Sequence, residues 1–350
     1  MARQTLRTAG LSWQGQWSAD ADTRLQLGES RNTYESQPSY YRTETTLRNF
    51  VLQQGQRVGA HHFSATLERR EDALLNPATE FSDTLQGRRA QNALALGWRA
   101  EFGEHALQAH VRHDQDSEFG SQPTGSLAWG WQVLPAWRVM ASAATSFRAP
   151  TLYQRFSEYG NATLVPESGR NVELALRWTD AHSSASATLY QNTLRNLITF
   201  GAAGPCASPF GCYVNVGRAR YQGLTLAAET RLLGVAVHGS VDYHDPRNQD
   251  RDLLLARRAR VLATLGADGQ WAGWGWGIEA QGAGARFDDA ANKQRMGGYG
   301  LVNLRAERNL AAGLTLEARL DNVADKAYET ARTYGTAGRS AQLGLRWALR

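Results

Sequence analysis

The sequence has no long hydrophobic run, since no segment approaches the roughly 18 consecutive apolar residues that a membrane-spanning helix requires. This absence excludes a helical membrane protein. Common catalytic motifs are missing as well, with no G-x-S-x-G, no P-loop and no C-x-x-C. We therefore predict a protein that is not an enzyme and carries no cofactor. Because no apolar stretch follows the first residues, we also expect no secretory signal in this sequence.

Lysine is almost absent, and the formal charge of +5 comes from arginine. A basic chain suggests a nucleic-acid partner only where the charge gathers into a patch or a recognisable module. Here the arginines are spread singly along the chain, so we expect no nucleic-acid partner. Asp114, Asp116 and Glu118 form a short acidic run, but calcium needs several converging oxygen ligands. We predict no metal site.

Cysteine is also scarce. Cys206 and Cys212 are the two cysteines, and both lie in one Gly- and Pro-containing loop with five residues between them. Two thiols alone would bind a metal poorly, whereas a disulfide closing that loop would suit an oxidising compartment. We predict a Cys206–Cys212 disulfide.

Apolar and polar residues alternate along most of the chain, as in Leu314, Leu316, Ala318 and Leu320. Residues two apart on a strand share a face, so each such run is a strand with one apolar and one polar face. About seventeen strands are expected, near 4–17, 23–36, 40–53, 56–73, 88–102, 105–118, 124–134, 137–147, 169–180, 184–198, 213–232, 234–244, 254–266, 271–287, 297–309, 314–323 and 338–347.

The connections alternate between short and long, which is typical of an outer-membrane barrel with tight periplasmic turns and extended extracellular loops. Tryptophans stand near the short turns, where such barrels carry an interfacial aromatic girdle; these are Trp98, Trp131, Trp137, Trp178 and Trp271. A soluble β-sandwich also alternates, but its strands are shorter, about 5 to 6 residues. The predicted fold is all-β, an antiparallel up-and-down transmembrane β-barrel.

The longest connection, residues 148–168, contains three large aromatic residues, Tyr153, Phe156 and Tyr159. Long loops of barrels are commonly functional, and rigid aromatic side chains provide large contact surfaces. The alternative is a loop folded inward, with its aromatics packed against the barrel wall. Both interpretations remain open, and the three residues are predicted as ligand-binding candidates.

Three segments resemble the signatures of TonB-dependent outer-membrane receptors. Residues 145–152 read T-S-F-R-A-P-T-L and residues 159–167 read Y-G-N-A-T-L-V-P-E; residues 213–224 read Y-V-N-V-G-R-A-R-Y-Q-G-L; residues 320–330 read L-D-N-V-A-D-K-A-Y-E-T, followed by Gly338 and Arg339. Within that family the chain is most similar to the vitamin B12 (cobalamin) receptors, through L-L-L-A-R-R-A-R at 253–260 and the final segments. The resemblance implies that Arg257 contacts a corrinoid, with Tyr334 and Arg339 as further ligand-binding residues.

That family has a signal peptide, a TonB box and a plug domain before a barrel of 22 strands. The resemblance therefore implies that residues 1–350 are one partial barrel domain, the C-terminal part with about seventeen strands and without the plug. It also implies active uptake of a large scarce ligand across the Gram-negative outer membrane. The expected partners are a corrinoid or siderophore, outer-membrane lipid, and the TonB complex acting through the missing segments. The alternatives are a siderophore receptor, a passive porin-like channel and a soluble carbohydrate-binding β-protein.

Overall fold

The computed structural model describes residues 2–38, 40–80, 82–201, 204–206 and 208–348. These residues are built almost wholly from antiparallel strands, with one short helix, α1 (Leu152–Phe156). The chain forms two compact units, unit 1 with Met1–Trp131, Ser142–Val172 and Thr193–Arg218, and unit 2 with Gln132–Ala141, Glu173–Asn192 and Ala219–Arg350. None of the described helical residues forms a segment of the length and apolarity that a membrane crossing needs.

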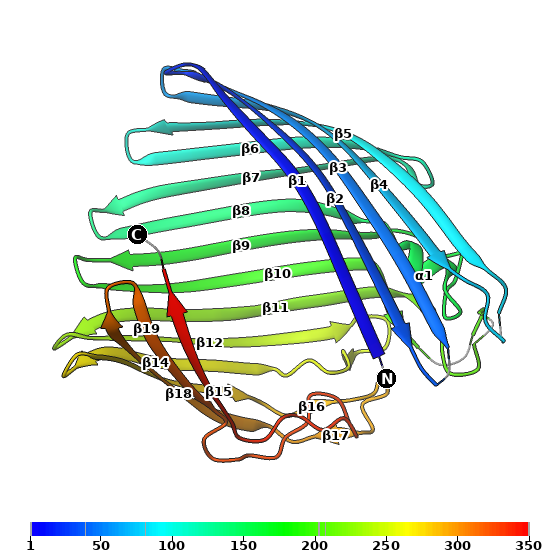
Figure 1. Cartoon of the computed structure of the whole chain (residues 1–350). Helices are drawn as coiled ribbons and strands as arrows, with labels where there is room; N and C mark the ends of the chain where they lie inside the picture. Colours follow the sequence, from blue (N-terminus) through cyan, green and yellow to red (C-terminus); the bar gives the residue numbers. More distant parts are fainter. Residues whose placement is uncertain (1, 39, 81, 202–203, 207, 349–350) are drawn as a thin grey trace. The chain divides into compact units, whose positions relative to one another are not determined.

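Unit 1 contains a run of strands in which each pairs antiparallel with the next (Figure 1). These strands are β1 (Ala2–Ser18), β2 (Ala21–Ser36), β3 (Tyr41–Val58), β4 (His61–Asn76), β5 (Leu85–Phe102), β6 (His105–Asp116) and β7 (Gly120–Leu134). The strands are long because alternation of apolar and polar residues continues through most of their length. They establish the predicted antiparallel, up-and-down, all-β architecture in this unit.

Unit 2 continues the same design. Its long strands are β12 (Val235–Asn248), β14 (Val261–Trp271), β15 (Trp274–Ala283), β18 (Tyr299–Ala311), β19 (Leu314–Asp321) and β20 (Ser340–Trp347), and each pairs with the next. The strands β8 (Trp137–Arg148), β9 (Glu167–Thr179), β10 (Ser183–Phe200) and β11 (Tyr213–Leu232) contribute residues to both units, and the last three residues of β7 belong to unit 2. Three very short strands were not expected, namely β13 (Leu253–Leu254), β16 (Arg286–Phe287) and β17 (Arg295–Met296).

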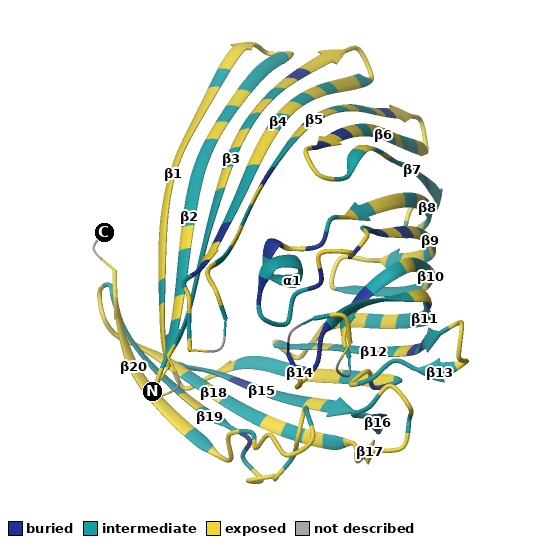
Figure 2. Cartoon of the chain, turned by 90° about the vertical axis from the view of Figure 1, so that its right-hand side faces the viewer, coloured by how far each residue is buried: buried dark blue, intermediate teal, exposed yellow. Residues whose placement is uncertain are grey.

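The two faces of the unit 1 sheet differ in what covers them. On β5, a Cβ on Gly87 would meet Phe156 and Leu152, and Arg89 donates to Pro150 O. This side of β5 therefore faces residues 149–166, the α1 segment, and we call it the covered face. Figure 2 shows α1 and these strands. Leu94 and Leu96 are an odd number of residues from Arg89 and therefore lie on the other side, the open face, where they are 46% and 49% exposed. Registered neighbours on the open face form an apolar row across five strands, consisting of Trp13, Leu25, Leu52, Leu67 and Leu94.

Aromatic side chains gather beside the short turns, as the sequence predicts. In unit 1, Trp98 Nε1 donates to His61 Nδ1 at 3.1 Å, and His105 stacks on Trp131 with ring centres 5.8 Å apart. In unit 2, Trp137 and Trp178 are 6.5 Å apart, and Trp271 is 77% exposed next to its turn. These positions suit the girdle that aromatic residues form at a membrane interface.

Two predicted turns were placed wrongly. The β3–β4 connection lies at Gly59 and Ala60 and not at 53–55, and Gly59 has φ +59°. The β14–β15 connection lies at Ala272 and Gly273, with φ +50° and +79°, and not at 267–270. A tight hairpin needs residues in the left-handed region, which glycine adopts at little cost. Polar residues such as those at 53–54 and 268–270 were mistaken for turns although they lie within β3 and β14.

Candidate functional site

The α1 segment, residues 149–166, forms a compact structure in unit 1. Its helix begins after Thr151, whose Oγ1 accepts the backbone N–H of Gln154 at 3.1 Å while Gln154 Oε1 accepts the N–H of Thr151 at 2.9 Å. This reciprocal capping satisfies N–H groups that a short helix would otherwise leave unpaired. A Cβ on Gly160 would lie 2.6 Å from the backbone of Arg155, so only glycine allows the chain to turn back there.

A buried arginine of the sheet holds the start of this segment. Arg89, on the covered face of β5, donates to Pro150 O at 2.6 Å and forms an ion pair with Asp72 at 2.6 Å; its side chain is 7% exposed. Asp116 Oδ2 lies 3.7 Å from Arg89 Nε. Sequence reasoning did not identify Arg89, because its partners on β4, β6 and the α1 segment are far apart in the chain. A charge this buried is tolerated because it is paired and hydrogen-bonded.

A second ion pair joins the two ends of the α1 segment. Arg148 binds Glu167 through Nε and Nη2, with both distances 2.7 Å, and Glu167 Oε1 also accepts the N–H of Ile198 at 2.7 Å. The Glu167 side chain is 8% exposed and that of Arg148 is 55% exposed. A planar guanidinium matches a carboxylate bidentately, which fixes geometry as well as adding energy. The pair therefore sets the distance between the ends of β8 and β9.

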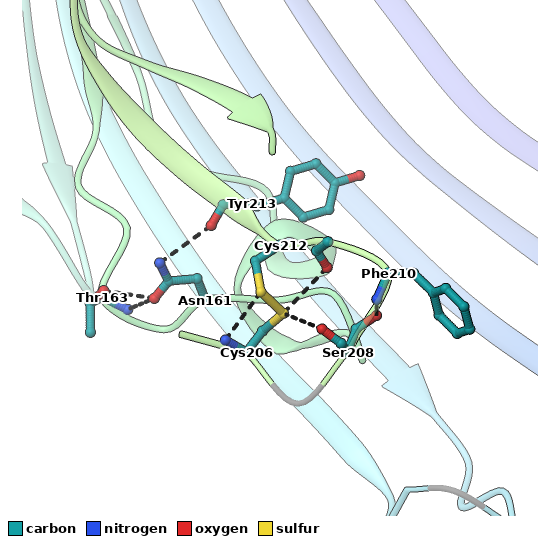
Figure 3. The surroundings of a disulfide bond; sticks show 8 residues. Asn161, Thr163, Cys206, Ser208, Phe210, Cys212 and Tyr213 are labelled. Atoms are coloured by element: carbon teal, nitrogen blue, oxygen red, sulfur yellow. Dashed lines mark hydrogen bonds between the residues drawn. A yellow bond between two sulfur atoms is a disulfide. The ribbon is translucent and has the colours of Figure 1, made fainter. Parts of the chain in front are cut away.

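Two asparagines fasten the segment to neighbouring strands. Asn161, which is 8% exposed, donates to Tyr213 O at 3.3 Å and accepts from Thr163 (Figure 3). Asn215 donates to Val165 O at 3.0 Å and accepts the N–H of the same residue at 3.0 Å. Side-chain amides have both donors and acceptors, so each can close a loop against backbone. Both residues belong to the signature segments recognised in the sequence, where their structural role was not visible.

The cysteine loop lies next to this segment. Sγ of Cys206 and Sγ of Cys212 are 1.93 Å apart, and the surroundings of the bond are shown in Figure 3. Cys212 is fully buried, and its carbonyl accepts the N–H of Gly201 at 2.9 Å. Phe210, within the closed loop, is 83% exposed. The loop thus presents an exposed aromatic ring that the sequence prediction did not include.

Two of the three predicted loop aromatics enter a ring cluster. The cluster comprises two groups of rings with centres 5.4 to 6.4 Å apart, Tyr34 with Tyr41, and Tyr153 with Tyr213, Phe200 and Tyr159. A hydrogen bond joins the two groups. The hydroxyls of Tyr41 and Tyr153 are 2.9 Å apart. Burial raises the pKa of Tyr153, and burial followed by the hydrogen bond to Glu158 raises the pKa of Tyr159 to about 12. Both loop tyrosines therefore remain neutral at physiological pH.

Phe156 has a different position. A Cβ on Gly87 would come within 2.5 Å of its ring, and Asn76 on β4 donates to its carbonyl at 3.3 Å. The guanidinium of Arg155 lies 4.8 Å from the centre of the same ring and forms an ion pair with Glu118. Phe156 thus packs against β4 and β5, whereas Tyr153 and Tyr159 contact ring side chains of β3, β10 and β11. All three aromatics fold onto the strands, as the inward-folded alternative predicts.

The predicted residue Arg257 lies in unit 2, at a junction of three loops. Arg257 has φ +59°, its N–H donates to Phe287 O at 2.6 Å, and its Nε donates to Asp288 Oδ1 at 2.8 Å. Asp288 also accepts the backbone N–H of Arg332 at 3.0 Å. That N–H, together with Arg257, lowers the pKa of Asp288. The guanidinium is 51% exposed, so it can still offer donors to another group.

The two remaining predicted residues lie in the last loop of unit 2. Tyr334 is 69% exposed and follows Arg332 by two positions, so it lies near the Asp288 junction. Arg339 is held through its backbone N–H, which donates to Asp325 Oδ1 at 2.8 Å. The structure thus brings Arg257 and the loop of Tyr334 together, and holds Arg339 through a separate contact.

The acidic residues considered for calcium are paired with arginines. Asp114 binds Arg112 at 2.7 Å, Asp116 faces Arg89, and Glu118 binds Arg155. Asp289 accepts the backbone N–H groups of Gln294, Lys293 and Ala291, which lower its pKa. The hydrogen bond from Gln294 has the largest effect. Within the part of the chain that the structure describes, no three His, Cys, Asp or Glu side chains gather as metal ligands.

Comparison with protein-family models gives one match, and it covers residues 2–323. The matched family is described as TonB dependent receptor-like, beta-barrel. The chain belongs to this family. It is a family of the outer membrane, and its members are receptors and transporters, not enzymes.

Solved structures with the same fold include three receptors or transporters of metals and their chelates. A mutant of the ferric enterobactin receptor PfeA from Pseudomonas aeruginosa has a TM-score of 0.83 and 17% identity, over 99% of this chain and 62% of that one. The FrpB iron transporter from Neisseria meningitidis gives 0.78 and 16%, over 99% and 63%. The copper transporter OprC gives 0.80 and 14%, over 98% and 65%. The chain thus spans less than two thirds of the length of these proteins.

The family's membrane setting explains a large apolar hollow in unit 2 of the receptor chain. It measures about 1080 Å³, and its lining includes Trp178, Leu226, Val241 and Leu265. Leu226 and Val241 are neighbours in register and are 47% and 45% exposed. The opposite face of the same strands carries polar contacts, such as Tyr190 to Asp242 at 3.0 Å. The hollow therefore belongs to the apolar surface, and the ligand-binding candidates lie elsewhere.

Proposed function

We propose that this chain belongs to a receptor that takes up a large, scarce metal chelate across the outer membrane, with energy delivered through the TonB complex. The family match over residues 2–323 supports the receptor class. Loops and inward-facing side chains would recognise the chelate, and no covalent chemistry is required of this chain. The TonB complex would act through segments outside this sequence.

For the ligand we propose a ferric siderophore in preference to the corrinoid favoured by the sequence resemblance. Ferric enterobactin, iron and ferric-catecholate receptors are named among the structures of the same fold. The observation that carries the proposal is the ring cluster of unit 1, in which Tyr153 and Tyr159 present half-buried aromatic faces. Flat aromatic chelating groups can stack on such faces, and neutral phenols add hydrogen bonds without repelling an anionic chelate.

A corrinoid remains the second candidate, and Arg257 is the residue that favours it. Half of its guanidinium is exposed, and Tyr334 in the adjoining loop supplies an exposed ring. However, the charge of Arg257 is already compensated by Asp288 at 2.8 Å. An arginine that is paired in this way has less to gain from a phosphate or amide of a ligand.

Equilibrium binding to the full-length receptor in detergent tests the proposal. A ferric tris-catecholate and cyanocobalamin would be titrated against the unmodified protein, Tyr153→Ala, Phe156→Leu and Arg257→Ala. We expect the ferric chelate to bind, and Tyr153→Ala to weaken it about ten-fold, the loss of one well-packed aromatic contact. Phe156→Leu is the matched control, because Phe156 packs on the strand wall. Cobalamin binding that depends on Arg257, with no binding of the ferric chelate, would show the ligand assignment to be wrong.

A further inference from the structure

The open face of unit 1 carries a row of arginines that runs across five strands. Arg7 on β1 lies opposite Arg31 on β2, and the row continues through Thr46, Ala73 and Arg88. Like charges directly opposite each other on neighbouring strands repel, and this repulsion destabilises the pair unless an anion compensates it. The row therefore has an electrostatic cost, which the sheet offsets only in part through the contact of Arg31 with Glu44 at 3.8 Å.

The glutamates of the same face form ion pairs mainly with arginines outside the row. Glu29 pairs with Arg48 at 2.6 Å and Glu71 with Arg69 at 2.8 Å. Arg42 lies within 3.5 Å of both Glu35 and Glu44. The best contact of Arg31 is 3.8 Å, to Glu44, and the described residues include no ion-pair partner for Arg7 or Arg88. Positive charge consequently remains in excess along the row.

A hollow of about 510 Å³ lies in this row, and its lining includes Arg31, Arg48 and Arg88 together with Thr46 and Ala73. One carboxylate of the open face, that of Glu71, also lines it, and this group is paired with Arg69. The small side chains of Thr46 and Ala73 leave the space between the arginines open. Adjacent strands are about 4.8 Å apart, so the Cα atoms of Arg31 and Arg88, three strands apart, are separated by about 14 Å. Two long side chains can therefore reach one anionic group from opposite sides. A second hollow, of about 290 Å³, adjoins Arg7 and Arg31, and Glu35 and Glu44 also line it.

The row stands at a fixed distance from the apolar part of the same face. Arg31 follows Leu27 by four residues on β2, which corresponds to about 13 Å along a strand. Leu27 is registered with Phe50, which is 43% exposed, and the apolar row through Leu52, Leu67 and Leu94 follows. The arginines lie on the side of the connections 37–40 and 77–84, which are longer than the turns at the other ends of these strands. Lipid headgroups lie just beyond the apolar part of a membrane, which is where these arginines stand relative to the apolar row.

From this arrangement we propose that the arginine row docks a phosphate-bearing lipid of the outer leaflet, with its phosphate between Arg31 and Arg88 and its acyl chains against the apolar row. Two guanidinium groups provide forked donors that match phosphate oxygens. The docking depends on the membrane setting of the family, and it is independent of which chelate the receptor carries. The lipid would compensate the charge of Arg31, and so weaken its repulsion with Arg7, and hold the open face in the leaflet.

Lipid titration of the full-length receptor tests this proposal. Diphosphorylated lipid A and its dephosphorylated form would be added in detergent micelles, and bound lipid measured by native mass spectrometry. We expect the Arg31→Gln/Arg88→Gln double variant to bind the diphosphorylated lipid at least about ten-fold more weakly, as expected for two lost charge-assisted contacts. The dephosphorylated lipid should bind both proteins equally. Arg70→Gln is the matched control, because Arg70 is 47% exposed, lies on the covered face and should have no effect.

A second variant guards against a folding defect. Thr46→Glu places a carboxylate inside the hollow, where it would pair with the arginines, so lipid binding should fall while the midpoint of thermal unfolding stays equal or rises. Equal binding of the two lipids, or equal losses for Arg70→Gln and the double variant, would overturn the proposal. If inorganic phosphate displaces neither lipid, the site binds a phosphate that is anchored in the membrane, as proposed. Complete displacement by inorganic phosphate would instead show a free-anion site. Unchanged binding of the ferric chelate by both variants would separate this result from the uptake function.

Discussion

Glu167 is the residue on which the geometry of the α1 segment depends most directly. Its carboxylate accepts two N–H groups of Arg148 and the backbone N–H of Ile198, at 2.7 Å each. The side chain is nearly buried, so water cannot replace these donors easily. Removing its charge would leave Arg148 and the N–H of Ile198 without their acceptor.

We expect Glu167→Gln to lower the free energy of unfolding by roughly 2 kcal/mol, less than for a fully buried pair because Arg148 is half exposed. The midpoint of denaturant-induced unfolding in detergent measures this change. Limited proteolysis should cut first within the α1 segment. The control is Glu101→Gln, which breaks a pair with Arg99 in which both side chains are more than 60% exposed. Equal destabilisation by the two variants would contradict the role given to Glu167.

Asp288 should make the loop junction of unit 2 sensitive to acid. Its pKa is lowered in the folded protein by the N–H of Arg332 and by Arg257, so the unfolded chain binds the proton more tightly. The stabilisation is therefore fully present above the ordinary aspartate pKa of about 3.9 and is lost as the pH falls through the lowered folded value. We expect hydrogen exchange near Arg332 to accelerate only at such acidic pH.

Asp288→Asn should show the faster exchange already at neutral pH, because the amide cannot provide the same charge. The control is Asp252→Asn, since Asp252 is 85% exposed and pairs with Arg247 at 3.0 Å at the surface. Exchange near Arg332 that is unaffected by both Asp288→Asn and acid would refute this account of the junction.

The sequence identified several structurally important residues but not the contacts that they make. Asn161, Glu167 and Asn215 lie in segments that resemble a receptor signature, yet their partners are 19 to 52 positions away in the chain. Arg89 lay in no signature segment, and its contacts arise only when β4, β5 and β6 are side by side. Contacts between distant segments are set by register, which a single sequence does not display.

At the scale of elements, the alternation of apolar and polar residues predicted the strands correctly, whereas short polar stretches did not identify the turns. The runs around Leu107 and Val111 and around Leu314 and Leu320 are strands as predicted. By contrast, the helix at Leu152 was missed, since five residues carry no helical period. The true turns at Gly59 and Gly273 differ from nearby polar stretches only by backbone conformations with positive φ.

The α1 segment should be sensitive to one added methyl group. A Cβ on Gly160 would meet the carbonyl carbon and oxygen of Arg155 at 2.6 Å, and backbone cannot move aside as a flexible side chain can. We expect Gly160→Ala to cost about 1 to 3 kcal/mol of unfolding free energy, a typical cost of overpacking. Thermal unfolding in detergent measures it. Gly297→Ala is the control, because nothing lies within 4 Å of its Cβ position. Equal midpoints for the two variants would count against the close turn at Gly160.

At the scale of the whole molecule, the chemistry of the two sheet faces separates the roles. In unit 1, the open face carries the apolar row and the arginine row, which suit lipid chains and lipid phosphates. The covered face carries the α1 segment, and Tyr153 and Tyr159 bring it into the ring cluster. Composition alone could not divide the arginines between these faces, whereas register does.

The most direct test of the central claim is uptake by cells whose only copy of this receptor is the full-length gene. Radiolabelled ferric tris-catecholate and radiolabelled cyanocobalamin would be offered to cells with and without TonB, and to cells carrying Tyr153→Ala. The account predicts iron accumulation that requires TonB and falls about ten-fold in the variant, with no accumulation of cobalamin above background. Accumulation of cobalamin, or an iron flux that persists without TonB, would contradict it.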